Sequence, residues 1–386
     1  WGCDKELGRV RALIEAFSDG LDNNPNISIV GRLMYHRTSR SILQSRQKVI
    51  AHYESNRKFI EANGRINKPI IITGAYRTGT TLLQRLMGED PQARSPFMYE
   101  LESPTPPLQT GNDPLADPRI AQSNSFLNAA NLFTPGFLSA MAKSHLMSAT
   151  EKEESFIASL LHHGLDVTQA ANAGKAFITL LNDPSFTPAI FRYERLFYTM
   201  LDAYCPAPSH WIFKAPSYAP YFSGIFDEYT DARVVLMHRT PLEALPSACR
   251  LFETVCLPGS VDGSFNKHRF GEFIENAWSG CLSAPLEFRR NHPERESQIF
   301  DCRYDDLVSD PIAMVKNIYA YFGINCCAEF EKKMLKYLHE NGQGKHGRHE
   351  YSLEEYGYTE NDLYRRNKKY MDNFEFGAQL LDSSLR

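Results

Sequence analysis

A glycine-rich segment near residue 75 contains the residue types best suited to hold an anion. The apolar run from Ile70 to Thr73 is followed by Gly74-Ala75-Tyr76-Arg77-Thr78-Gly79-Thr80-Thr81 and then by an apolar helical pattern. The glycine spacing and the closing threonine match the phosphate-binding loop G-x-x-x-x-G-K-[ST], whose backbone amides surround a phosphate at a helix N-terminus. Thr80 replaces the lysine of that pattern, and Arg77 adds a fork of donors that suits phosphate or sulfate. The segment therefore predicts a site for an anion without the β- and γ-phosphates that the lysine would reach.

A second group of polar residues lies between residues 211 and 251. Lys214 ends one predicted strand, Arg239 follows the next, and Pro241 begins a predicted helix, where proline is tolerated. Ser247 lies about two turns into that helix. A cation at a strand end and a hydroxyl on the following helix would together hold a further phosphate. The sequence shows no clear second acidic motif for magnesium, which favours a metal-free site for a group with a single phosphate.

The elements that must position these residues follow from the pattern of apolar runs. Strand-like runs occur before Gly74 and at residues 210–214, 232–238 and 297–304, and helical patterns follow them. Strands that alternate with helices predict an α/β fold with a parallel sheet, whose ligands gather at the carboxyl ends of the strands. We predict a helix at Thr80 to Met87 and, because of its prolines, an irregular segment from Asp90 to Pro107.

The remaining helical regions suggest how the chain is organised. The first 65 or so residues have apolar positions at helical spacing, and residues 64–69 separate them from the first strand. We therefore expect a helical arm at residues 1–66 and a main domain at residues 67–386. Residues from about 115 to 205 are predicted to be mostly helical, and their many aromatic side chains look exposed: Phe126, Phe133, Phe137, Phe156, Phe177, Phe186, Phe191, Tyr193, Phe197 and Tyr198.

Composition places the chain among ordinary globular proteins. It has 386 residues, of which 42% are hydrophobic and 23% are charged, and its formal net charge is −4. That charge argues against a nucleic-acid binder, which usually carries a basic excess. No run of 18 or more apolar residues predicts a membrane span. The chain begins at Trp1 rather than Met, so we expect a trimmed product.

The cysteines bear on metal binding and on the compartment. None of the eight forms a CxxC pair, which makes zinc unlikely by pattern, and Cys249 and Cys302 lie in apolar contexts that suit reduced, buried thiols. Reduced thiols favour the cytoplasm. A secretory-pathway lumen stays open because the N-terminus is trimmed.

The two polar segments together carry a resemblance to a known family. "YRTGTT" followed by "HRTPLEALPS" resembles the sulfotransferases that use 3′-phosphoadenylyl sulfate (PAPS), in the branch with an "RTGTT" loop and an acidic motif after it. The resemblance covers roughly residues 68 to 365 in three blocks, the last from Asp301 to Leu363. It implies a P-loop-like three-layer fold, with a central mainly parallel sheet flanked by helices and a helical acceptor-site insertion. It also implies PAPS as donor, adenosine 3′,5′-bisphosphate (PAP) as product, and no metal.

The resemblance also implies which residues hold the donor. The first block would hold the 5′-phosphosulfate, and the second would hold the 3′-phosphate through Arg239 and Ser247. A late glycine-bearing loop would cover the adenine nucleotide. The implied donor-binding residues are Arg77, Thr78, Gly79, Thr80, Thr81, Arg239, Ser247, Lys345, Gly347 and Arg348.

Sulfuryl transfer requires one base for the acceptor hydroxyl and cations for the transferred group. The resembling branch keeps a catalytic glutamate after an arginine, which here implies Glu100 after Arg94, with Glu102 as the competitor. The alternative for Glu100 is a structural pair with Arg94. Arg77 and Lys214 are the implied cations, Lys214 through its "KAP" motif. The acidic run from Glu151 to Phe156 is predicted to be a solvated helix start, although relatives carry an acidic pair near here.

One departure from the family bears on the acceptor. Many relatives read "K-S-P-x-H" where this chain has Tyr218 at the histidine position. Because tyrosine replaces the histidine, the resemblance favours Glu100 more strongly as the base. His145, His162 and His163 are possible substitutes, but lone histidines on helical stretches are more often structural. The aromatic residues between 115 and 205 would suit an apolar or aromatic alcohol as acceptor. Packing in the core between helices explains each single aromatic residue equally well.

Three functions therefore remain open from sequence. The first is a PAPS-dependent sulfotransferase, with a small-molecule hydroxyl as acceptor and a homodimer as a possible assembly. A tyrosylprotein-type enzyme is a variant of it, weakly disfavoured by the acidic balance. The second is a P-loop kinase or NTPase with a displaced lysine, which would need Mg²⁺ and an acidic motif. The third is a relative that binds the donor without turnover.

Overall fold

The computed structural model describes residues 4–133, 136–142, 147–155, 167–181, 183, 185, 187–341 and 352–376. Within them, five strands form one sheet: β1 (Ile70–Gly74), β2 (Ala93–Arg94), β3 (His210–Lys214), β4 (Arg233–His238) and β5 (Ile299–Arg303). Their order is β2-β3-β1-β4-β5, and each neighbouring pair is parallel. The predicted α/β fold with a parallel sheet is confirmed.

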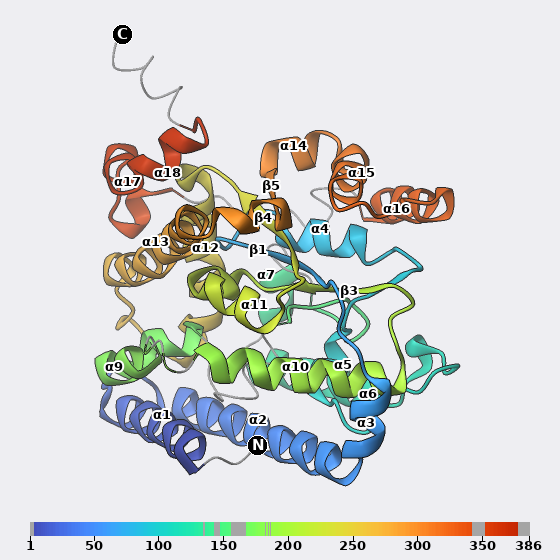
Figure 1. Ribbon diagram of the computed structural model, residues 1–386. Coiled ribbons are helices and arrows are strands. Elements are labelled where there is room, and N and C mark those ends of the chain that lie inside the picture. Colours follow the sequence, from blue (N-terminus) through green and yellow to red (C-terminus); the bar gives the residue numbers. More distant parts are fainter. Residues whose placement is uncertain are drawn as a thin grey trace.

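Helices cover both faces of this sheet. Their bounds are α1 Asp4–Asn23, α2 Ile29–Ser55, α3 Arg57–Asn63, α4 Thr80–Met87, α5 Met98–Glu102, α6 Arg119–Phe133, α7 Phe137–Ala142, α9 Val167–Leu181, α10 Thr187–Tyr204, α11 Phe222–Glu228, α12 Pro241–Cys256, α13 Lys267–Asn291, α14 Tyr304–Ser309, α15 Pro311–Tyr321, α16 Ala328–Glu340, α17 Glu360–Arg366 and α18 Lys368–Asn373. Short 3-10 turns are η1 Pro114–Ala116, η3 Pro216–Tyr221, η4 Leu257–Gly259, η5 Pro293–Gln298 and η6 Glu354–Tyr356. Figure 1 shows α4, α15 and α16 above the sheet and α10, α11 and α2 below it.

The three isoleucines of β1 show why the sheet forms a middle layer. Ile70 and Ile72 pack with residues of α4, α15 and α16, whereas Ile71 packs with residues of α10 and α11. All five residues of β1 are buried. A continuous run of β-branched residues suits a parallel strand covered on both faces, because successive side chains point to opposite sides.

The register of the strands brings their carboxyl ends to one edge. Ile72 of β1 lies beside Lys214 of β3 and Val235 of β4. The chain then leaves the sheet at Gly74, Lys214 and His238. The predicted helix starts follow two of these exits, since α4 begins at Thr80 and α12 begins at Pro241.

Residues 4–63 are mostly helical, as predicted, and they pack onto the rest of the chain. Leu13, Phe17 and Leu21 of α1 share a buried cluster with Phe177 of α9. Val49, Tyr53 and Ile60 of α2 and α3 join the core below the sheet. The division at residues 66 and 67 stays a prediction, and these contacts give the arm no core of its own.

Two expectations about local structure were wrong. The segment from Asp90 to Pro107 is not irregular throughout, because it contains β2 and α5. The side chains of five aromatic residues between 115 and 205 are buried rather than exposed: Phe177, Phe191, Tyr193, Phe197 and Tyr198. The prolines favoured an irregular segment, and so β2 and α5 were not expected. In residues 187–204, aromatic residues alternate with charged ones, which suggested an exposed helix. The aromatic residues there are buried because α10 is covered on more than one side.

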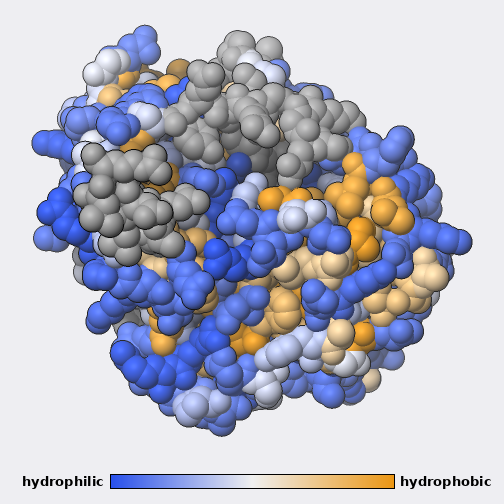
Figure 2. Space-filling view, turned by 90° about the horizontal axis from the view of Figure 1, so that it is seen from above, coloured by the Kyte–Doolittle hydropathy of each residue, from blue (hydrophilic) through white to orange (hydrophobic). Residues whose placement is uncertain are grey.

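The surface agrees with the composition. Viewed from above, hydrophilic residues dominate the visible face, and hydrophobic residues form patches between them (Figure 2). None of the helices in the described ranges combines the length and the apolar character needed to cross a bilayer.

Candidate active site

The loop between β1 and α4 has the backbone shape of an anion site. Gly74 and Gly79 have φ of 139° and 92°, and Arg77 has φ of 70°, an uncommon value for a residue with a side chain. The hydroxyl of Thr78 donates to the carbonyl of Ala75 at 2.7 Å and closes the turn. Gly79 caps α4 without a side-chain hydrogen bond. The first amides of α4 are therefore not capped by a side chain at Gly79, which suits an anion at this end of the helix.

Close packing adds a second reason for the two glycines. A Cβ atom on Gly79 would lie 2.8 Å from the Tyr304 ring, and one on Gly74 would lie 2.5 Å from the carbonyl oxygen of Met237. Both distances are shorter than real Cβ contacts. The loop therefore depends on glycine at both ends for space as well as for φ.

Three residues predicted to bind the donor come together beside this loop. Arg77 Nε donates to Ser247 Oγ at 3.0 Å, and Arg239 Nη1 donates to the Arg77 carbonyl at 3.0 Å. The Arg239 guanidinium lies 4.0 Å from the centre of the Tyr304 ring and also pairs with Glu243 at 2.9 Å. Arg77 thus faces the Ser247 side of the site. The two guanidinium groups and the hydroxyl form a donor set that suits a phosphate dianion.

Lys214 lies on the other side of the loop, fully buried. Its Nζ is 3.4 Å from Thr81 Oγ1, in the first turn of α4. It forms an ion pair with Glu154 at 2.5 Å and lies 3.8 Å from Glu153. The lysine that is missing from the loop is therefore supplied at the same helix end by β3.

The segment that carries these glutamates is held in place by the backbone. Ser155 N donates to the Lys214 carbonyl at 2.8 Å, and Lys214 N donates to Ser155 Oγ at 3.0 Å. Glu153 N donates to the Pro96 carbonyl at 3.0 Å. The expectation of a solvated helix start was wrong over residues 151–155, because Glu153 is buried and the segment lies along the end of β3. Phe156 lies outside the described residues.

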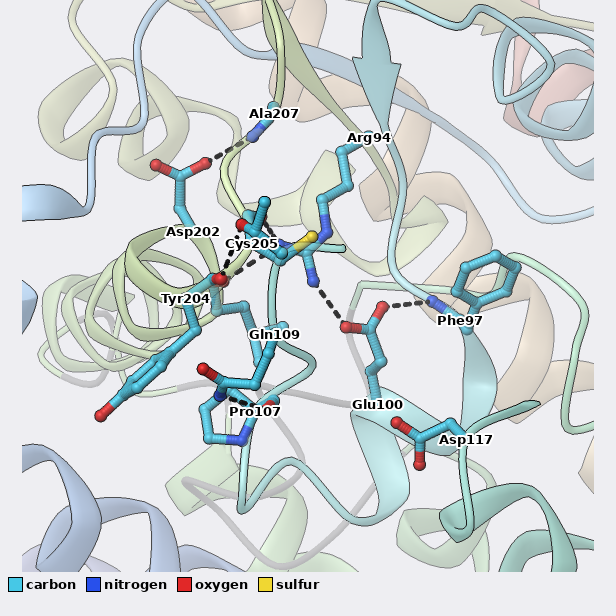
Figure 3. Close-up of polar contacts among 12 residues, drawn as sticks. Arg94, Phe97, Glu100, Pro107, Gln109, Asp117, Asp202, Tyr204, Cys205 and Ala207 are labelled. Carbon is cyan, nitrogen blue, oxygen red and sulfur yellow. Dashed lines mark hydrogen bonds and ion pairs between the residues drawn. The ribbon is translucent and has the colours of Figure 1, made fainter. Parts of the chain in front are cut away.

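Glu100 is placed away from these contacts, in a buried ion pair. Its Oε1 accepts from Arg94 Nη2 at 2.6 Å, and its Oε2 accepts from the Phe97 amide at 3.2 Å (Figure 3). Arg94 also donates to the carbonyls of Leu201 and Cys205. The side chain of Glu100 is fully buried, and that of Arg94 is 10% exposed. These are the contacts of the structural alternative, and the catalytic role of Glu100 stays a prediction that they do not support.

Replacing Glu100 by alanine should therefore destabilise the fold. Removal of one partner of a buried ion pair typically costs about 3–5 kcal/mol, because the other charge stays buried without compensation. We expect that decrease in the free energy of unfolding, measured by urea denaturation, and a smaller one for Glu100→Gln, whose single amide oxygen keeps one of the two hydrogen bonds. Glu54→Ala removes an exposed Glu–Arg pair and is the matched control. Equal stability of Glu100→Ala and the control would contradict this role.

Glu102, the competitor for the same role, is also largely buried. Burial raises the pKa of Glu102 to about 7; the Ser123 hydroxyl, which donates to the carboxylate, opposes this, and the charge of Glu153 adds to it. The carboxyl group thus binds its proton more tightly in the folded chain than in the unfolded chain, where the pKa is near 4.5. The protonated carboxyl group therefore contributes to stability below pH 4.5, and this contribution to the free energy of unfolding is lost as the pH rises to about 7.

The pH dependence of stability should show this effect. Between pH 4.5 and about 7 the free energy of unfolding should fall by up to roughly 3 kcal/mol relative to Glu102→Gln. Urea denaturation of both proteins at several pH values measures the difference. Parallel pH profiles for the two proteins would show that Glu102 ionises normally in the folded chain.

Tyr218, at the family's histidine position, lies in the core rather than at the loop. Its hydroxyl donates to Glu194 Oε2 at 2.5 Å, and both side chains are buried. Burial and the Glu194 charge raise the pKa of Tyr218 well above its ordinary value. Tyr218 is therefore a hydrogen-bond donor and does not act as a base in place of the histidine.

Several sequence predictions fall on residues that the structure does not describe. Lys345, Gly347, Arg348, His145, His162 and His163 lie outside the described residues. Among the described residues, no three His, Cys, Asp or Glu side chains form a group that could hold a metal ion. The metal-free reaction stays a prediction.

The structure adds neighbours that the motifs did not indicate. Tyr304 packs under Arg239, and Trp278 Nε1 donates to the Tyr76 carbonyl at 3.1 Å. Glu154 pairs with Lys214 although 60 residues separate them. The signal for Glu154 was the acidic run from Glu151 to Glu154, which the assumption of a solvated surface set aside.

Comparison with known proteins gives consistent matches. A family model described as "Sulfotransferase family" matches residues 69–329. The fold is similar to that of sulfotransferase STF9 from Mycobacterium avium, with a TM-score of 0.81, 22% identity, and coverage of 92% of this chain and 88% of that one. It is also similar to that of STF1 from Mycobacterium tuberculosis H37Rv, with a TM-score of 0.77, 24% identity, and coverage of 95% and 92%. No curated protein sequence matches the chain.

Proposed function

The chain belongs to the sulfotransferase family, and on that premise we propose that it transfers the sulfuryl group of PAPS to a hydroxyl of a small molecule. The observation that carries this proposal is the meeting of three strand ends. The loop after β1, Lys214 at the end of β3, and Arg239 just after β4 lie at one edge of the sheet. This is the edge at which ligands bind in open α/β sheets.

We assign the two ends of the donor to two parts of the site. Arg77, Arg239 and Ser247 form the cluster that suits the 3′-phosphate. The uncapped first turn of α4, with Thr80 and Thr81, suits the phosphosulfate. This assignment moves the Arg77 side chain from the phosphosulfate, where the family pattern places it, toward the 3′-phosphate.

Lys214 has the position to stabilise charge during the transfer. Negative charge develops on the oxygen that bridges sulfur and phosphorus as the S–O bond breaks. The Lys214 ammonium lies against the first turn of α4 and is fully buried, so its charge is weakly screened by water. Preorganised charge of this kind is often the largest single contribution to catalysis.

The acidic surroundings of Lys214 support a small acceptor. Glu153 and Glu154 contact the lysine, and Glu102 lies close enough to Glu153 for its pKa to respond. An acidic peptide would meet repulsion from these carboxylates, and the net charge of −4 adds to it. A neutral alcohol or phenol would not. The homodimer and the cytoplasmic location stay predictions.

Binding of the donor product tests the proposal directly. Isothermal calorimetry with PAP in the presence of EDTA should give binding that added Mg²⁺ does not strengthen. Incubation with PAPS and a set of phenols and alcohols should release PAP in step with a sulfate ester. Binding of Mg·ATP with no response to PAP would overturn the proposal and favour the kinase, for which Lys214 would replace the loop lysine. Tight PAP binding without turnover would favour the inactive relative.

A further inference from the structure

The ion pair between Lys214 and Glu154 points to a catalytic role for Glu154 that the loop motif does not indicate. We propose that Glu154 is the general base of the transfer, held by Lys214 until the charge that develops on the bridging oxygen draws the lysine away. The inference rests on the proposed sulfuryl transfer and names a further residue for it. It follows from three observations: the contact of Glu154 with Lys214, its partial exposure, and the fixed backbone that carries it.

Exposure distinguishes Glu154 from Glu100. The Glu154 side chain is 15% exposed beside a fully buried lysine, whereas that of Glu100 is 0% exposed. Both oxygens of Glu100 already accept hydrogen bonds, from Arg94 and from the Phe97 amide. A base must take a proton from the acceptor and later release it to water. Glu154 is partly exposed and so suits both transfers, whereas Glu100 would have to break a buried ion pair first.

Contact with Lys214 places Glu154 near the reacting group. Lys214 Nζ lies 2.5 Å from Glu154 Oε1 and 3.4 Å from Thr81 Oγ1. The carboxylate is therefore separated from the first turn of α4 by a single ammonium group. An acceptor hydroxyl that reaches the sulfuryl group there would lie within hydrogen-bond range of Glu154, as a general base requires.

The backbone fixes Glu154 in this position. Ser155 and Lys214 exchange hydrogen bonds through backbone and side-chain atoms. The Gln84 side chain donates to the Glu153 carbonyl at 2.8 Å, and the Tyr198 hydroxyl donates to the Ser155 carbonyl at 3.2 Å. Rigid placement of this kind is what positions a catalytic group.

The step balances as follows. The acceptor oxygen forms a bond to sulfur, and the bond between sulfur and the bridging oxygen of the donor breaks. The acceptor proton passes to the Glu154 carboxylate and then to water, and the electron pair of the broken bond stays on the 5′-phosphate. Charge that develops on the bridging oxygen attracts Lys214, which releases Glu154 to bind the proton. The products are a sulfate ester, PAP and one proton.

Acceptors of different acidity test the role of Glu154. The full chain and its Glu154→Gln variant are assayed with PAPS and either 4-nitrophenol, which is largely ionised at mildly alkaline pH, or phenol, which is not. We expect kcat for phenol to fall by about 10²–10⁴-fold, the usual contribution of a general base. The loss for 4-nitrophenol should be much smaller, because its anion needs no base. Glu154→Asp should recover part of the loss, and the acid limb of the phenol pH profile should disappear in Glu154→Gln.

Three controls make the result specific. Glu331→Gln removes an exposed Lys–Glu pair and should leave both rates unchanged. Glu100→Gln tests the competing assignment, because a loss of kcat for phenol alone in this variant, with a retained kcat in Glu154→Gln, would make Glu100 the base. PAP affinity of Glu154→Gln, measured by calorimetry, should stay close to that of the unsubstituted chain. Equal losses for the two phenols, or a retained kcat for phenol, would overturn the assignment to Glu154.

A second measurement needs no acceptor. Calorimetry with PAP on the unsubstituted chain tests the donor site alone. PAP binding together with a retained kcat for phenol in Glu154→Gln would overturn only the assignment to Glu154. Absence of PAP binding by the unsubstituted chain would instead mean that the proposed function itself has failed.

Discussion

Replacement of Lys214 by methionine should lower kcat by about 10²–10³-fold and leave PAP affinity nearly unchanged, because the interaction is strongest in the transition state. Lys214 is fully buried between Glu154 and Thr81, so no water molecule or neighbouring cation easily replaces its charge. Methionine has a similar length and no charge. Initial rates with saturating PAPS measure the effect on kcat, and calorimetry with PAP measures binding.

The variant also removes one partner of a largely buried ion pair, so its fold must be tested separately. Loss of the lysine alone is expected to destabilise the chain by about 3–5 kcal/mol. The double variant Lys214→Met/Glu154→Gln removes both charges and should recover most of that stability but none of the activity. Lys316→Met, which breaks an exposed pair with Glu331, is the matched control. Activity that returns with stability would show that Lys214 acts only on the fold.

Arg239→Ala should weaken PAP binding by about 10–100-fold, the loss expected for a hydrogen bond to a charged group. Arg239 is held by the Arg77 carbonyl and by the Tyr304 ring, and it lies next to Ser247 through Arg77. Ser247→Ala should cost less, since a neutral hydroxyl contributes about 0.5–1.5 kcal/mol. Calorimetry with PAP measures both variants.

A ligand that lacks the 3′-phosphate separates the local effect from a damaged loop. Adenosine 5′-monophosphate should bind Arg239→Ala and the unsubstituted chain with similar affinity. Arg11→Ala removes an exposed arginine that pairs with Glu15 four residues on, as Arg239 pairs with Glu243, and it should change neither affinity. A parallel loss for both nucleotides in Arg239→Ala would indicate a collapsed loop and not a 3′-phosphate contact.

Regular elements with a strong local signal could be predicted from sequence. The run from Ile70 to Thr73 has β-branched residues throughout and is bounded by a proline and a glycine, so its strand needed no tertiary information. Residues 210–214 gave the bounds of β3 in the same way. In contrast, β2 has two residues in a proline-rich stretch, and it exists because β3 lies beside it.

The parts of the site that depend on neighbouring residues in the sequence could be predicted from motifs. The spacing of Gly74 and Gly79 and the position of Ser247 on α12 are local facts. The pair of Lys214 with Glu154 is not, because it depends on a segment that folds back along β3. A run of charged residues usually indicates a solvated surface. Here Glu153 is buried, and Glu153 and Glu154 both contact Lys214. The direction of the Arg77 side chain depends on a φ of 70°, which no propensity favours.

The packing of the N-terminal helices has a consequence for synthesis on the ribosome. Leu13, Phe17 and Leu21 of α1 lie against Phe177 of α9, which follows about 150 residues later. At a translation rate of about 5–20 residues per second, the apolar side of α1 waits roughly 8–30 s for its partner. Strand β1 must likewise wait for β3 and β4. The nascent chain therefore exposes its first helices and the apolar strand β1 together, and this interval is when a chaperone would protect it best.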